Sequence, residues 1–231
     1  MNRVLLTLHV SPAVSADVAK YAKLVAIVER CGTVHSRIKL HKMLYVLKSL
    51  GYPVLERFEY LHFGPYSEDL AAELQSSVNA VYLQERVTET TEEEDEEPRR
   101  RYDYSPGRKG AELVAQTASS DPTLTAIADA MAGVAEELNE STPARLELVA
   151  TLMYFQDQNV PAGLLVRVLQ GNKPQFADAE VRGALEYIAD LRTRAGFTPP
   201  PDFSSIIGLV KEGPPTDAAQ DLDEEIYGGG E

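Results

Sequence analysis

The sequence predicts a mainly α-helical fold, in which a winged-helix-like N-terminal part with one β-hairpin packs on a C-terminal helical part. Apolar residues recur at helical spacing along most of the chain. Two short segments rich in β-branched and aromatic residues flank a single strongly charged turn. Three predicted helices precede this hairpin and another follows it, which is the element order of a winged helix-turn-helix.

The first three predicted helices have recognisable starts or ends. Residues 15–32 form the first, with Ser15 as N-cap and Gly32 as its stop. Residues 36–51 form the second, which carries a stripe of leucine and methionine between Ser36 and Gly51. Residues 67–83 form the third, and the alternating segment before it, 58–63, is expected to be a short extended piece.

The hairpin and the later helices are marked by turn and proline signals. Strand-like residues stand at 87–91 and 102–104, around the six consecutive acids of the turn, Glu92–Glu97. An N-cap residue followed by proline is a strong helix start. That pair occurs at Ser105-Pro106, Asp121-Pro122 and Thr142-Pro143, so each is expected to open a helix.

These elements suggest three regions of different charge and composition. We expect a winged-helix-like domain over 1–120, a helical part over 121–196, and a mostly disordered acidic tail over 197–231. The net charge of the whole chain is −14. Residues 1–60 nevertheless hold nine Lys and Arg against four Asp and Glu, so a basic head precedes an acidic body.

Composition excludes several classes of protein. A charge of −14 disfavours a surface that coats nucleic acid over its whole extent. The single cysteine, Cys31, excludes an internal disulfide and fits a reducing compartment. No apolar run approaches the roughly 20 residues that a membrane helix needs. We therefore expect a cytoplasmic protein with no membrane partner.

The segment "HFGPYSEDL" has two interpretations. Gly64 and Pro65 set special backbone angles, and Ser67 can cap a helix whose first turn carries two acids. Ser67 as a nucleophile would need a G-x-S-x-G turn after a buried parallel strand, and the sequence has neither. Helix initiation accounts for every residue, so no catalytic residue is predicted.

Two segments carry a family resemblance. "KLHKMLYVLKSLG" and "FGPYSEDLAAEL" resemble the YwgA-type bacterial family and, more remotely, the Panacea domain of SocA-like antitoxins. The matching positions are Lys39, Leu40, Lys42, Met43, Leu44, Tyr45, Gly64, Pro65, Tyr66 and Ser67. "LELVATLMYF" and "NKPQF" also look like the later half of YwgA-type chains. The resemblance implies a helical, partly winged-helix domain without catalytic residues. It also implies a function in toxin neutralisation or as an adaptor protein.

Basic residues on the second helix and the hairpin favour a different function, DNA binding. A basic wing can grip phosphates while a helix enters the major groove. The residues that would do so are Arg37, Lys39, Lys42, Arg99, Arg100, Arg101, Arg108 and Lys109. The third helix, which would read the bases, has three acids and no Lys or Arg, and this is a poor surface for a polyanion.

The sequence gives little support for a metal site or for a pair of catalytic carboxylates. Cys31, His35 and His41 do not match the spacing of a closed metal site, so neither a metal nor another cofactor is predicted. Acidic pairs such as Glu136/Glu137 fit the solvated face of a helix. We therefore expect a non-catalytic protein-interaction module, an antitoxin, adaptor or defence-associated accessory, whose protein partner has a basic surface. A winged-helix DNA-binding regulator is the alternative, an enzyme ranks third, and a homo-oligomer stays open.

Overall fold

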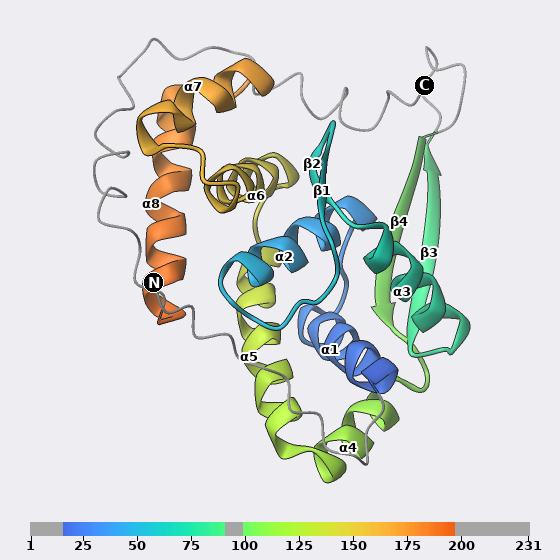
Figure 1. The fold of residues 1–231 in the computed structure, drawn as a ribbon. Helices are drawn as coiled ribbons and strands as arrows, with labels where there is room; N and C mark the ends of the chain where they lie inside the picture. The colour runs from blue at the N-terminus through green and yellow to red at the C-terminus, as the bar shows by residue number, and fades with distance from the viewer. Residues whose placement is uncertain (1–15, 91–98, 197–231) are drawn as a thin grey trace.

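A computed structural model describes residues 16–90 and 99–196 of the 231-residue chain. The predicted mainly α-helical architecture is confirmed (Figure 1). The helices are α1 (Ala16–Cys31), α2 (Arg37–Ser49), α3 (Glu68–Asn79), α4 (Gly110–Ser120), α5 (Pro122–Asn139), α6 (Pro143–Asp157), α7 (Ala162–Asn172) and α8 (Asp178–Arg194). The strands form two antiparallel pairs, β1 (Glu59–Leu61) with β2 (Gly64–Tyr66), and β3 (Leu83–Thr90) with β4 (Arg99–Pro106).

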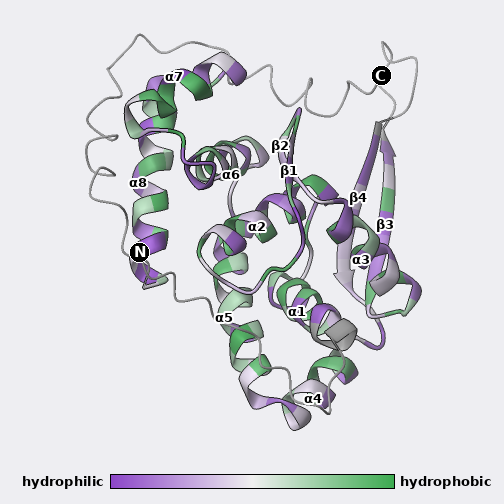
Figure 2. Cartoon of the chain, in the orientation of Figure 1, coloured by the Kyte–Doolittle hydropathy of each residue, from purple (hydrophilic) through white to green (hydrophobic). Residues whose placement is uncertain are grey.

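The β3–β4 hairpin has the position of a wing. Its register runs from Leu83 opposite Pro106 to Thr90 opposite Arg99. Val34, in the connection between α1 and α2, forms an antiparallel bridge with Tyr104 of β4. This single-residue bridge adds a minimal third strand, so the order α1, bridge, α2, α3, β3, β4 is that of a winged helix. The hairpin projects from the helical body, and its outer half is mainly hydrophilic (Figures 1 and 2).

One hydrophobic cluster connects the two predicted parts of the chain. Helix α1 packs on α5, and α2 packs on both α5 and α6. Helix α6 is buried continuously from Leu146 to Met153 and again at Phe155, and it carries two polar residues, Glu147 and Thr151, into the core. The core therefore passes from the wing side, at Tyr104, through α2 and α6 to Leu185 of α8.

The cap predictions have mixed outcomes. The side chains of Ser67, Asp121 and Thr142 each accept a hydrogen bond from a first-turn amide, which confirms those three helix starts. Ser36 precedes α2, but its side chain makes no cap hydrogen bond. The predicted start at Ser105-Pro106 is wrong, because β4 continues to Pro106 and α4 begins at Gly110.

Backbone contacts explain why the helix start is displaced. The amides of Gly107 and Lys109 donate to the carbonyls of Tyr82 and Val81, so the chain stays tied to the β3 side. A Cβ atom at Gly107 would lie 2.4 Å from the carbonyl oxygen of Val81. The glycine permits this close approach, and the approach delays the helix.

Within the segment 58–63, Glu59–Leu61 form strand β1 as expected for an extended piece, whereas His62 and Phe63 lie in a turn. Residues Gly64–Tyr66, predicted only as helix punctuation, form strand β2 and close a second small hairpin with β1. Gly64 has φ of +87°, in the region that glycine adopts without strain. The acidic turn Glu92–Glu97 and the tail 197–231 lie outside the described residues. In the part that is described, no helix is long and apolar enough to cross a membrane.

Candidate functional site

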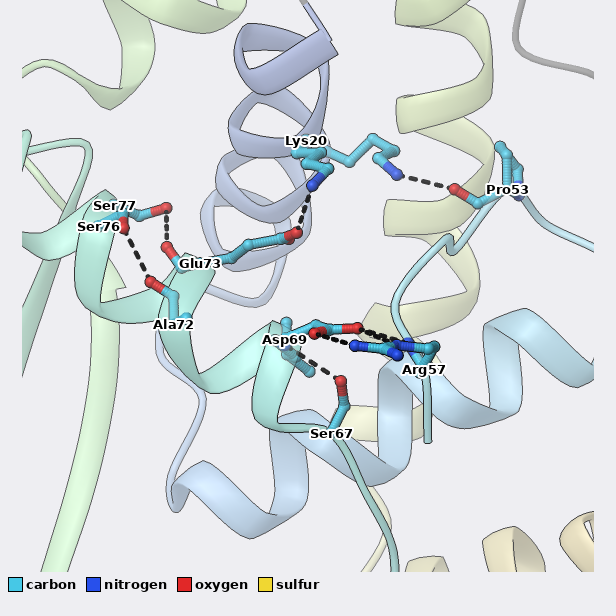
Figure 3. Close-up of polar contacts among 11 residues, drawn as sticks. Lys20, Pro53, Arg57, Ser67, Asp69, Ala72, Glu73, Ser76 and Ser77 are labelled. Atoms are coloured by element: carbon cyan, nitrogen blue, oxygen red, sulfur yellow. Dashed lines mark hydrogen bonds and ion pairs between the residues drawn. The ribbon is translucent and has the colours of Figure 1, made fainter. Parts of the chain in front are cut away.

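Helix α3 occupies the position of a recognition helix, and its exposed side chains carry no positive charge. Glu68, Ala72, Gln75 and Asn79 are exposed on it. Asp69, at its first turn, pairs with the exposed Arg57 at 3.3 Å (Figure 3). The helix thus offers one exposed acid, Glu68, and two amides to a partner, and it has no exposed cation that could bind a phosphate backbone.

The predicted basic residues do not form one exposed face. On α2, Arg37 donates to Glu85 and Tyr104 and stacks over the ring of Tyr102. The Lys39 amine donates to the carbonyl of Asn139. Lys42 is only 2% exposed, which removes it from any contact with a large ligand.

The hairpin cations divide into paired and unpaired groups. Arg100 pairs with Glu89 at 2.8 Å, and Arg101 binds both carboxylate oxygens of Asp103. Arg108 and Lys109 are exposed in the turn before α4. Arg99 lies opposite Thr90 at the outer end of the described hairpin. The Glu92–Glu97 turn is not described, and Glu89 and Asp103 neutralise two of the three arginines Arg99–Arg101.

The residues that carry the family resemblance build a buried polar joint between α2, β2 and α6. The Lys42 amine donates to the carbonyl oxygen of Pro65 at 2.9 Å. A Cβ atom at Gly64 would lie 2.9 Å from Thr151 Oγ1 and 3.6 Å from Lys42 Nζ. Gly64 therefore lets β2 approach both helices closely. Leu40, Met43 and Leu44 are buried in the core beside this joint.

His41 extends the joint toward α3. Its Nδ1 accepts a hydrogen bond from the amide of Ser67 at 3.1 Å, and its ring stacks on Tyr66 with centroids 4.1 Å apart. Burial lowers the pKa of His41 to about 3, and the neighbouring Lys42 and Arg37 charges lower it further in the same direction. The imidazole is therefore neutral at physiological pH and acts as an acceptor that positions the N-terminus of α3.

A second lysine enters the joint from the C-terminal part. Lys173 pairs with Glu147 of α6 at 2.5 Å, and both side chains are almost fully buried. The Lys173 amine also donates to the carbonyl oxygen of His62 at the β1–β2 turn. Burial lowers the pKa of Lys42 to about 7, an effect that Glu147 opposes and Lys173 reinforces. Each amine has a fixed structural acceptor, so neither is presented to a substrate.

Another buried cluster holds α3 against α1 (Figure 3). Glu73 of α3 pairs with Lys20 of α1 at 3.1 Å. Burial and the adjacent Glu56 carboxyl raise the pKa of Glu73 to about 7. Lys23 and Lys48, which lie in the same cluster, donate to carbonyl oxygens of the 53–56 segment. In composition this acid–lysine group resembles a catalytic dyad. The amines of Lys23 and Lys48, however, donate to loop carbonyls, and Lys20 pairs with Glu73 itself.

Among the described residues, no group of His, Cys, Asp and Glu could hold a metal ion. Cys31 is half-buried, and burial raises the pKa of its thiol to about 11. Glu136 and Glu137, weighed as a carboxylate pair, form separate ion pairs with Arg30 and Arg194. Glu180 accepts from the amide of Ala177 and so caps α8.

One polar pocket of about 290 Å³ lies between the α1–α2 connection and the base of the hairpin. It is lined by Thr33, His35, Gln84, Arg86, Asp103 and Ser105. His35 was considered only as a metal ligand from the sequence, and Arg86 was missed. The register of the hairpin brings the lining together, because Arg86 opposes Asp103 and Gln84 opposes Ser105 on one face, and no local sequence pattern signals that register.

Comparison with known proteins gives a distant relationship. No family model matches the chain, and no solved structure matches it. The chain is 26% identical over 173 residues to the uncharacterized protein YwgA of Bacillus subtilis (strain 168). The match covers 75% of this chain and 96% of that protein. Part of the expected resemblance is thereby confirmed, since the chain is a distant homologue of YwgA.

Proposed function

We propose that the protein is a non-catalytic interaction module that acts on a protein partner, as an antitoxin, adaptor or defence-associated accessory. The observation that carries the proposal is the surface of α3. In the position from which winged-helix proteins read DNA, this helix exposes Glu68, Ala72, Gln75 and Asn79. A helix that exposes one acid, two amides and no base fits a basic protein surface better than a phosphate backbone.

The buried chemistry supports a non-catalytic role. The strongly shifted groups His41, Lys42 and Glu73 are less than 10% exposed. Their partners are carbonyl oxygens, an amide and a neighbouring ion, all of which belong to the fold. A catalytic acid or base must reach the proton that it transfers. These groups instead tie α1, α2, α3 and β2 to one another.

Affinity capture from the native host tests the proposal, with nuclease-treated and untreated lysates side by side. We expect one protein partner that survives nuclease and is lost with Glu68→Lys, which reverses a charge on the exposed face of α3. Glu186→Lys is the matched control, because Glu186 is an exposed glutamate on the distant helix α8. Recovery that depends on nucleic acid, or equal loss with both variants, would contradict the proposal.

The alternative, a DNA-binding regulator, has one observation in its favour. Arg86, Arg108 and Lys109 are exposed on or beside the hairpin and make no ion pair with any described residue. Duplex binding through them would show a salt slope that falls when Arg108 and Lys109 are replaced by Gln, by about 0.9 per phosphate contact. A slope that is unchanged in this variant would leave the wing without a role in DNA binding.

A further inference from the structure

The pocket at the base of the hairpin is built from one face of the β3–β4 pair and the connection that precedes α2. Directly opposed residues of an antiparallel pair share a face, so Gln84, Ser105, Arg86 and Asp103 all point to the same side. Thr33 and His35 flank Val34, whose bridge to Tyr104 fixes them beside that face. All six lining residues carry polar or charged side chains, which favours a ligand that can accept or donate hydrogen bonds.

Asp103 orients the pocket, and its charge is already neutralised. Arg101 donates to both of its oxygens at 3.0 and 3.1 Å. The amide of Ser36 donates to Oδ1, and His35 Nδ1 lies 3.3 Å from Oδ2. With Nδ1 held by the carboxylate, the Nε2 atom of His35 is directed away from it. Asp103 therefore positions His35 and Arg101 and has little charge left to repel an anion.

Arg86 supplies the net positive charge of the pocket. Its side chain is exposed and makes no ion pair or hydrogen bond with any described residue. The acids of β3, Glu85 and Glu89, lie on the opposite face of the hairpin, where they bind Arg37 and Arg100. Around the cavity, Arg86 and Arg101 outnumber the single carboxylate of Asp103. A guanidinium presents a fork that matches two oxygens of a phosphoryl group.

We propose that this pocket binds the phosphoryl group of a small phosphorylated molecule. Arg86 binds two of its oxygens, the hydroxyls of Thr33 and Ser105 and the amide of Gln84 donate to the phosphoryl group, and the His35 ring completes the lining. The volume of about 290 Å³ is close to the lower end of the range for small-molecule sites, roughly 300–1,000 Å³. The proposal goes beyond the protein-interaction function and uses a different surface, because α3 contributes no residue to the pocket.

A small molecule fits the pocket better than a nucleic acid. The hydrogen-bond donors line a single small pocket, whereas binding of a nucleic acid backbone needs several cations spaced along an extended surface. On the same face of β3 and β4, the next pair outward is Thr88 and Arg101, and Arg101 is committed to Asp103. One phosphoryl group therefore satisfies the available cation.

Nuclear magnetic resonance of the full chain with labelled histidine side chains tests this proposal, with pyrophosphate as the probe. We expect a saturable shift of the His35 imidazole and none at the buried His41. Arg86→Gln should weaken the affinity about tenfold, because a charge-assisted contact is lost. Arg167→Gln, at an exposed arginine of α7, is the matched control and should leave the affinity unchanged.

Three results would overturn the proposal. The first is no saturable shift at His35 at millimolar pyrophosphate. The second is a shift whose apparent affinity changes equally in Arg86→Gln and Arg167→Gln. That result would show that pyrophosphate acts through general ionic strength and not through a specific site. The third is saturation by a 16-base-pair duplex but not by pyrophosphate, which would assign the face to nucleic acid. None of these results depends on the partner of α3. The phosphoryl-binding proposal can therefore be refuted without refuting the protein-interaction proposal.

Discussion

Two regions of this protein use charged side chains in opposite ways. Around Lys42, Gly64 and Glu147, ionisable groups are buried and each is tied to a fixed partner. At the hairpin base, Arg86 and His35 are exposed around an open pocket. The residues that make the chain recognisable as similar to YwgA-type proteins lie in the buried region. The motif residues Lys42 and Gly64 therefore hold the elements of the fold together, whereas the proposed ligand contacts lie at the hairpin base.

The largest expected effect is at the buried ion pair of Glu147 and Lys173. Glu147→Gln leaves the Lys173 amine buried without its counter-charge, which should cost about 3–5 kcal/mol of the free energy of unfolding. Urea denaturation measures this cost. On the hairpin, Glu89→Gln removes a half-exposed pair with Arg100 and should cost less than about 0.5 kcal/mol. Equal costs at the two sites would erase the distinction between the regions.

A double variant sharpens the first prediction. If the cost of Glu147→Gln comes from an uncompensated amine, adding Lys173→Met should restore much of the stability. The residual loss would then reflect the contact of Lys173 with the His62 carbonyl. A double variant no more stable than Glu147→Gln alone would mean that packing, and not charge, dominates there.

The second effect concerns the glycine of the motif. Gly64→Ala places a Cβ atom 2.9 Å from Thr151 Oγ1 at a residue with φ of +87°, so we expect a loss of about 3 kcal/mol. Gly133→Ala is the matched control, since a Cβ atom at this position in α5 would meet nothing within 4 Å. Helix propensity then predicts a gain of about 0.5–1 kcal/mol. Thermal unfolding of both variants measures the contrast, and a neutral Gly64→Ala would show that β2 need not approach α6 so closely.

The third effect is a loss of folding stability at acid pH that originates at His41. Its folded-state pKa of about 3 lies below its ordinary value of 6.5, so the unfolded chain binds more protons between these pH values. His41 therefore makes the protein lose stability as pH falls from 6.5 toward 3, by up to about 1.4 kcal/mol per pH unit. His41→Asn keeps an acceptor for the Ser67 amide and cannot titrate. Its denaturation series should be flatter in this window, and parallel curves for the two proteins would refute the assignment.

The fourth effect has the opposite sign. The pKa of Glu73 is raised to about 7 from 4.5, so the folded state binds more protons in this range. Glu73 thus makes the protein lose stability as pH rises from 4.5 to about 7. Glu73→Gln should remove this dependence, whereas Glu186→Gln at an exposed site should not. A Glu73→Gln protein that still loses stability over this window would mean that other groups cause the loss.

The sequence predicted the parts of the fold that local chemistry determines. The caps at Ser67, Asp121 and Thr142 follow from residue type and spacing. The start at Ser105-Pro106 failed because a tertiary contact at Gly107 extends the strand. The β1–β2 pairing was missed because three-residue strands carry almost no periodic signal.

The site residues were harder to predict, for a physical reason. Lys42 was weighed as a phosphate ligand because lysine is usually exposed, yet α2 is buried continuously from Leu40 to Leu47. A helix that is enclosed on all sides carries its polar residues into the core, where they must find partners. The pocket was missed because it depends on the register between β3 and β4 and on the bridge at Val34, which no local pattern encodes.

The smallest effect on stability is expected where the largest effect on binding is proposed. Arg86→Gln removes an exposed side chain with no partner among the described residues, so the free energy of unfolding should change by less than about 0.5 kcal/mol. Arg101→Gln breaks the two-point contact with Asp103 and should cost up to about 1 kcal/mol. Urea denaturation of both variants, beside the pyrophosphate titration, separates the two roles. Arg86→Gln could instead destabilise the protein as much as Arg101→Gln does. Arg86 would then stabilise the fold, as Lys42 does, and the hairpin base would not differ from the buried region in how it uses charged side chains.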